Sequence, residues 1–236
     1  MTSQITVERR FCGPPTSGNG GYVCGRMADF VDGPAEVTLR MPPPLDTPLA
    51  IESVGGGEMV LTDDDTLVAV ARPVDLDIDV PEPVSLQAAE AAVVRYRGFR
   101  HHPFATCFVC GPEREAGDGL LIFPGLVNGV NTVAAPWMPD PSLAGEDGAV
   151  APVYLWAALD CPGYFAVAED GEPAVLGRMA ASIEGTVRPG EACIVMGWPI
   201  GREGRKLYSG TVVYAADGRL IARSRATWIR IDLPSS

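Results

Sequence analysis

The sequence predicts an α+β protein in which curved antiparallel sheets wrap around central helices. Four long strand-like segments follow one another near the C-terminus, at 174–187, 191–198, 206–215 and 219–231. An apolar helix, expected at 152–167, precedes them. The 22 prolines and 27 glycines of the 236-residue chain indicate many turns and more strand than helix. One helix followed by successive antiparallel strands is typical of an α+β fold.

The N-terminal part of the chain offers a second helix and a second group of strands. Apolar side chains recur near helical spacing over residues 18–32. Asn19 is a good candidate for the N-cap of this helix, and Asp32-Gly33-Pro34 marks its end. Alternation and turn residues predict strands at 35–40, 48–54, 58–62 and 66–72.

The middle of the chain connects these two groups. Residues 73–84 alternate acidic and apolar side chains between prolines, which indicates a connector. A helix is expected at 85–97, where Ser85 can act as its cap. Strands are expected at 119–124 and 130–135, followed by a loop at 139–148.

Composition and charge limit the classes of partner. The formal net charge of −12 argues against nonspecific binding to nucleic acid or to an anionic membrane surface. No segment approaches the ~18–20 consecutive apolar residues of a membrane span. The N-terminus lacks the apolar stretch of a secretory signal, so a cytoplasmic location is expected, with the six cysteines as reduced thiols.

The pair Cys107-x-x-Cys110, with His101 and His102 just before it, raises the question of a metal site. Thiols at this spacing can bind zinc. However, the sequence has no second Cys-x-x-Cys, and two adjacent histidines cannot easily bind from one strand face. A redox pair would need a helix directly after the motif, where Gly111-Pro112 stands. The sequence therefore favours buried small side chains and no zinc.

Nucleophilic catalysis by cysteine or serine has little support. Cys161 would need a histidine base, and the only histidines are His101 and His102. No Gly-x-Ser-x-Gly turn is present in the sequence.

Several motifs together resemble the hotdog-fold acyl-CoA thioesterases of the phenylacetate-pathway type. Cys107-Phe108-Val109-Cys110-Gly111-Pro112 with Gly119-Leu120 resembles the opening of that family. Leu159-Asp160-Cys161-Pro162-Gly163 resembles the end of its central-helix motif, and 182–190 its third strand and turn. The resemblance covers about residues 107–232 well and residues 10–75 more weakly. It implies a double hotdog: a trimmed N-terminal half (1–84), a helical linker (85–106) and a C-terminal half (107–236).

The family motif is His-Gly-Gly, with an acid nine positions after the histidine. In the first half of this chain Asn19-Gly20-Gly21 stands at the motif, and Ala28 stands at the acid position. In the second half Ala151-Pro152-Val153 replaces the motif, whereas Asp160 keeps the acid. Each copy has what the other lacks, so the resemblance implies one composite site, with Asn19-Gly20-Gly21 facing Asp160.

Each residue of this site has an expected role. A helix N-terminus offers free N–H donors to a carbonyl that gains negative charge, and glycine permits close approach. The Gly21 N–H would polarise the thioester carbonyl, Asn19 would position it, and Asp160 would activate water or attack directly. The acyl group is expected beside Gly20 and against four aromatic residues, namely Tyr22, Tyr154, Trp156 and Phe165. The alternatives are that Asp160 only bonds the turn at Pro162-Gly163 and that Gly20-Gly21 is a plain loop.

The resemblance implies hydrolysis of an acyl-CoA or related thioester, with coenzyme A as part of the substrate and no other cofactor. A noncatalytic thioester-binding protein is the first alternative, because asparagine cannot replace the acid–base work of histidine. A hydratase-like enzyme on the same fold is the second. The expected partners are the thioester and a second copy of the chain, in a dimer of double hotdogs.

Overall fold

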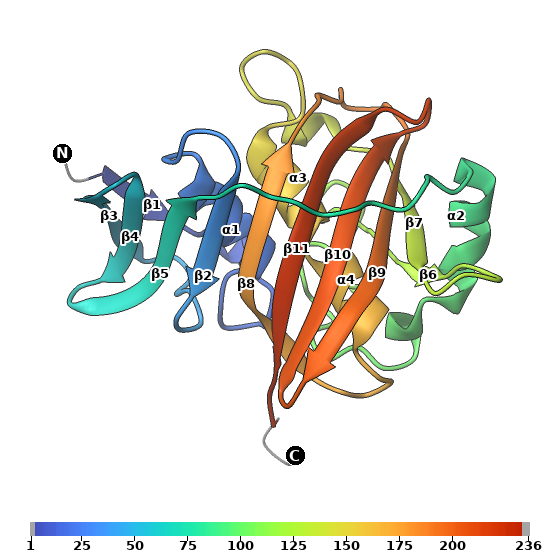
Figure 1. Ribbon diagram of the computed structural model, residues 1–236, viewed down its shortest axis with the longest axis horizontal. Helices are drawn as coiled ribbons and strands as arrows, with labels where there is room; N and C mark the ends of the chain where they lie inside the picture. The colour runs from blue at the N-terminus through green and yellow to red at the C-terminus, as the bar shows by residue number, and fades with distance from the viewer. Residues whose placement is uncertain (1–2, 233–236) are drawn as a thin grey trace.

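The computed structural model describes residues 3–232, and a single eleven-stranded antiparallel sheet forms its framework (Figure 1). The strand order is β1-β3-β4-β5-β2-β8-β11-β10-β9-β7-β6. The N-terminal strands and the C-terminal strands therefore lie in two blocks. They join where β2 pairs with β8, with Val37 opposite Met179.

The N-terminal block agrees closely with the expected strands. Its members are β1 (Ser3–Thr6), β2 (Ala35–Leu39), β3 (Pro48–Gly55), β4 (Glu58–Asp63) and β5 (Thr66–Pro73). Strand β1 was not expected from the sequence, because its four residues alternate too briefly to be distinguished from a loop.

The C-terminal block agrees along its four long strands and differs at its edge. Its members are β6 (Gly125–Leu126), β7 (Val133–Trp137), β8 (Ala174–Ile183), β9 (Cys193–Glu203), β10 (Lys206–Ala215) and β11 (Leu220–Arg230). The strand expected at 119–124 is irregular backbone instead. The Leu120 and Ile122 N–H groups bond to the carbonyls of Phe108 and Val109. This segment is therefore held by the loop at 107–111, here called the cysteine loop, and not by the sheet.

The helices expected at 18–32 and 152–167 both lie against the sheet. Helix α1 (Gly20–Ala28) belongs to the N-terminal block, and its N-cap Asn19 accepts a hydrogen bond from the Tyr22 N–H, as expected. The apolar helix expected at 152–167 is two helices, α3 (Pro152–Ala158) and α4 (Cys161–Val167). The chain bends at Asp160, just before Pro162-Gly163, because proline cannot supply the N–H that a continuous helix needs.

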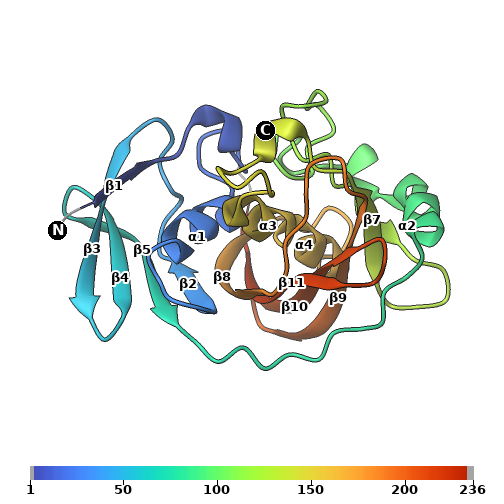
Figure 2. The same ribbon diagram turned by 90° about the horizontal axis from the view of Figure 1, so that it is seen from above.

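The helices and the connector occupy opposite faces of the C-terminal strands. In Figure 2 β8 to β11 curve around α3 and α4, and α1 lies beside α3. The connector from β5 to α2 (Leu86–Ala92) crosses the outer face of these strands in both views. Tyr214 Oη donates to the Pro81 carbonyl at 2.9 Å, and Arg223 donates to the Ile78 carbonyl at 3.1 Å, so the connector is bonded to the sheet. Within the described residues, no helix has the length and apolar character needed to cross a membrane.

Candidate functional site

The start of α1 and the break between α3 and α4 meet in the middle of the molecule. Asp160 Oδ2 accepts a hydrogen bond from Asn19 Nδ2 at 2.7 Å and another from the Gly21 N–H at 3.0 Å. The structure thus brings together the three residues expected to form the composite site, from segments about 140 positions apart in the chain. If a substrate carbonyl and a water lay between them, Gly21 N and the carboxylate would be roughly 5–9 Å apart. That expected distance was wrong, since the two groups are in direct contact.

The side chain of Asp160 does not stabilise the turn that follows it. The Gly163 N–H bonds to the backbone carbonyl of Asp160 at 3.0 Å, whereas the carboxylate faces α1 and makes no capping bond to α4. Oδ2 carries both hydrogen bonds from α1, and the other oxygen, Oδ1, is buried without a hydrogen-bond partner. A buried carboxyl with one unpaired oxygen is costly for folding, which makes this residue a functional candidate.

Burial governs the ionisation of this carboxyl. Removing the carboxylate from water raises the pKa of Asp160 to about 7, and the negative charge of Cys107 acts in the same direction. The Gly21 N–H and the Asn19 amide bond to the charged form and act in the opposite direction.

Close packing of the two helices explains the Gly21 position. Helices α1 and α3 run antiparallel, since Gly21 lies against Ala157 and Asp160 while Gly25 lies against Val153. A Cβ at Gly21 would come within 2.6 Å of Asp160 Cβ and 2.7 Å of the Trp156 carbonyl oxygen. Glycine is therefore required here for the packing that brings Asp160 to the helix start.

A cavity of about 280 Å³ opens beside this contact, and residues of both blocks line it. Asn19, Gly20 and Asp160 contribute to its polar part. The Gly20 N–H lies at the helix start and has no acceptor among the described residues, so it is a free donor in the lining. The apolar lining includes Leu39, Met41, Phe104, Tyr164, Phe165, Leu176 and Trp228.

Three of the aromatic residues expected to contact substrate lie elsewhere. Tyr22, Tyr154 and Trp156 are not in the lining of this cavity, so the structure does not place them beside Asp160 there. Tyr22 stacks on Phe11 at a ring-centroid distance of 4.1 Å, and Trp156 is buried where α3 packs on α1. Sequence periodicity places these side chains on the helices but does not say which side of a helix meets a cavity. Phe165 does line the cavity, as expected.

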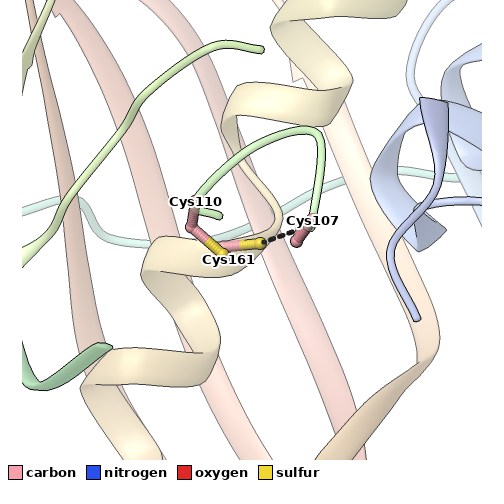
Figure 3. Close-up of side chains that lie close together, drawn as sticks. All are labelled: Cys107, Cys110 and Cys161. Atoms are coloured by element: carbon pink, nitrogen blue, oxygen red, sulfur yellow. Dashed lines mark hydrogen bonds between the residues drawn. The ribbon is translucent and has the colours of Figure 1, made fainter. Parts of the chain in front are cut away.

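The cysteine loop and the start of α4 form a second cluster at the cavity wall. Cys107, Cys110 and Cys161 are buried, and their sulfur atoms lie within 4.8 Å of one another (Figure 3). Asn19 Nδ2 lies 3.8 Å from Cys107 Sγ, so this amide stands between the cluster and Asp160. None of the six cysteines forms a disulfide. The sequence did not connect Cys161 with the pair at 107 and 110, because Cys161 lies 51 positions after Cys110.

His102 also lines the cavity, although the sequence suggested a poor position for it. Its Nδ1 accepts the Phe104 N–H at 2.9 Å, and its Nε2 lies 3.3 Å from Cys110 Sγ. Both ring nitrogens are therefore engaged, and burial lowers the pKa of this imidazole. A neutral imidazole whose two nitrogens already have hydrogen-bond partners is poorly suited to transfer protons to a ligand.

Comparison with solved structures decides the fold class. The chain superposes on a protein from Alicyclobacillus acidocaldarius described as having a hot dog fold, with a TM-score of 0.61 at 13% identity, over 98% of this chain and 94% of the other. This chain has the hot dog fold. A putative thioesterase from Novosphingobium aromaticivorans gives a TM-score of 0.60 at 14% identity, covering 98% and 96% of the two chains. A putative thioesterase II from Thermobifida fusca gives 0.62 at 13% identity, covering 98% and 92%.

The hot dog fold is thus supported over nearly the whole chain, while identities of this size say nothing of activity. A search of protein-family models found no match. No curated protein matched in sequence.

Proposed function

We propose that this chain is a double-hotdog protein that binds an acyl-CoA or related thioester and hydrolyses it at one composite site. The observation that carries the proposal is the contact of Asp160, from the C-terminal part, with the start of α1, from the N-terminal part, at the wall of an apolar cavity. Structural neighbours called putative thioesterases share the fold. The resemblance of Asn19-Gly20-Gly21 and Asp160 to the family motif points the same way.

The free donor at the helix start is the Gly20 N–H, and this refines the expected role of Gly21. Gly21 N–H is occupied by Asp160 Oδ2, whereas Gly20 N–H lines the cavity without an acceptor. A thioester carbonyl near Gly20 would meet both this donor and the positive end of the helix dipole. Asp160, as carboxylate, would then accept a proton from an attacking water through its unpaired Oδ1.

The missing histidine is compatible with this chemistry. A thiol leaving group has a pKa of about 8.5, so it can depart as a thiolate without a strong general acid. Asn19 holds Asp160 through its amide and caps α1 through its carbonyl oxygen, so it would position the acid and not transfer protons.

A noncatalytic binder is the second candidate, and one observation favours it. Both donors at Asp160 Oδ2 are satisfied within the protein, so the acid is held in place before any ligand arrives. Water activation would then depend on Oδ1 alone.

Turnover and binding should be measured together across short, long and aromatic acyl-CoAs. Loss of thioester absorbance is the suitable readout, because six free cysteines complicate reagents that detect released thiol. Hydrolysis that Asp160→Asn removes supports the enzyme. Ligand-induced thermal stabilisation without turnover of any ester supports the binder. The absence of both hydrolysis and stabilisation would reject both candidate functions.

The carrier can be tested at Arg40. This exposed arginine lies in the cavity lining and forms no ion pair among the described residues, so it is available to a ligand phosphate. Arg40→Ala should raise the KM for an acyl-CoA about 2–5-fold, as loss of a modest exposed ion pair implies. The KM for the matching acyl-pantetheine, which lacks the nucleotide phosphates, should stay unchanged. An equal rise for both esters would argue against a phosphate contact at Arg40.

A further inference from the structure

Three buried thiols from two distant segments meet at the cavity wall, and we propose that Cys107, Cys110 and Cys161 bind one zinc ion as thiolates. This replaces the expectation of no zinc, which rested on the lack of a second ligand pair in the sequence. The fold supplies a third thiol from the start of α4 (Figure 3).

The sulfur positions fit a tetrahedral ion. With Zn–S bonds of about 2.3 Å, two sulfur atoms of a regular tetrahedron are about 3.8 Å apart. The Sγ atoms of Cys107 and Cys161 are 3.6 Å apart, and all three sulfurs lie within 4.8 Å of one another. Small side-chain movements would therefore complete the coordination. Soft thiolate donors in this arrangement select zinc over the hard cations magnesium and calcium.

The loop around the first two cysteines is shaped to hold thiolates. Its turn is closed by the Gly111 N–H, which bonds to the Cys107 carbonyl at 2.9 Å. A Cβ at Gly111 would come within 2.5 Å of the Ala105 carbonyl oxygen, so only glycine permits this turn. The closed turn thus keeps the sulfur atoms of Cys107 and Cys110 within 4.8 Å of each other.

His102 supports this cluster as a hydrogen-bond donor. Its Nδ1 accepts the Phe104 N–H at 2.9 Å, which places the ring proton on Nε2. Nε2 then faces Cys110 Sγ at 3.3 Å as an N–H donor and has no lone pair for a metal. The fourth coordination position would belong to water, because all three cysteines line the cavity.

The decisive measurement is the metal content of untagged protein that is expressed in zinc-supplemented medium and purified under reducing conditions. We expect one zinc ion per chain in the parent and nearly none in Cys161→Ala. Cys193→Ala is the matched control, because Cys193 is also buried but lies in β9, outside the cluster, and this variant should keep its zinc. Asp160→Asn should also keep its zinc, so this test is independent of whether the chain hydrolyses thioesters.

Cobalt substitution reports on the ligands themselves. The Co²⁺ form should show thiolate-to-cobalt charge-transfer absorption, which Cys161→Ala weakens and His102→Ala retains. Chelator treatment should lower the Tm of the parent and leave the Tm of a folded Cys161→Ala variant unchanged. Zinc well below one ion per chain in the parent, without cobalt–thiolate absorption, would overturn the proposal. A Cys107–Cys161 disulfide in freshly purified protein would also overturn it, as would equal zinc loss in Cys193→Ala.

Discussion

The central helices of the two parts of the chain differ at both ends: α1 has the capped start with a free N–H, and α3 is followed by the acid. Helix α1 begins at Asn19-Gly20-Gly21, where a side chain caps the helix and the Gly20 N–H is free. Helix α3 begins at Ala151-Pro152, with no capping side chain and no N–H at its first position. The acid position shows the reverse, since Asp160 is buried at the end of α3 while Ala28 closes α1.

This difference shows that the buried Asp160, after the end of α3, depends on the start of α1 for its hydrogen bonds. Asp160 is 3% exposed, and the two hydrogen bonds to its carboxylate both come from the start of α1. Among the described residues, no hydrogen bond joins Ala28 to the start of α3, where Pro152 is exposed. If one site is sufficient, substitutions at the α1–Asp160 crossing should matter greatly, and the same kind of substitution at the opposite crossing should matter little.

The largest effect is expected from removing the acid. Asp160→Asn should lower the rate of thioester hydrolysis by about 10²–10⁴-fold, the usual contribution of a general base. The amide oxygen of the new side chain can still accept the Asn19 and Gly21 hydrogen bonds, so the Tm should not fall. Initial rates with a saturating acyl-CoA, together with thermal melts, check both parts.

The control for this variant is Asp29→Asn, at the exposed end of α1. It should leave the hydrolysis rate within about twofold, as expected for a surface carboxylate distant from the reaction. Unchanged turnover in Asp160→Asn would remove Asp160 from the chemistry and leave it as a structural residue.

The next effect is expected at the helix start itself. Asn19→Ala removes a cap worth about 1 kcal/mol. It also takes one partner from the buried Asp160, at a cost of about 1–3 kcal/mol. We therefore expect the free energy of unfolding to fall by roughly 2–4 kcal/mol, measured by urea denaturation, with activity falling as Asp160 loses its orientation.

Ser85→Ala is a matched control, because Ser85 caps α2 far from the cavity by accepting the Ala88 N–H. This variant should lose only about 1 kcal/mol and no activity. Equal losses in the two variants would mean that Asn19 is a cap and nothing more.

A third effect concerns helix packing. Gly21→Ala places a methyl group within 2.6 Å of Asp160 Cβ, so α1 and α3 must separate. Overpacking of this kind costs about 1–3 kcal/mol. Gly145→Ala should cost far less, since the nearest atoms to its Cβ would be 3.6 Å away. Urea denaturation of the two variants side by side tests this, and a Gly21→Ala variant as stable as the parent would contradict the packing account.

Much of the fold could be predicted from the sequence, because alternation and turn residues record strands directly. The segments at 206–215 and 66–72 match β10 and β5 closely for this reason. The Asn19 cap and the partnership of Asp160 with the α1 start were also predictable, from capping chemistry and from the complementary losses of the two motifs. These signals are local, or they repeat along the chain.

What could not be predicted depends on contacts between distant segments. Leu176 and Trp228 reach the cavity because β8 and β11 curve around the helices, and no local pattern records that curvature. Cys161 joins the cysteine loop only after folding. The break at Asp160 was signalled by Pro162-Gly163, yet the sequence does not say that the bend turns the carboxylate toward α1.

The smallest effect is expected at the opposite crossing. Pro152 is the first residue of α3 and is exposed, so Pro152→Ala restores a backbone N–H without disturbing the core. Loss of the rigid proline ring at a compatible position should lower the free energy of unfolding by about 0.4–1 kcal/mol. Thioester turnover should be unchanged, because Ala28 stands at the position in α1 where an acid would be needed. Measured beside Asn19→Ala, this variant compares the two helix starts directly. A rate change at Pro152 as large as that at Asn19 would show that both crossings take part, and the asymmetry between the two parts would then be one of sequence and not of function.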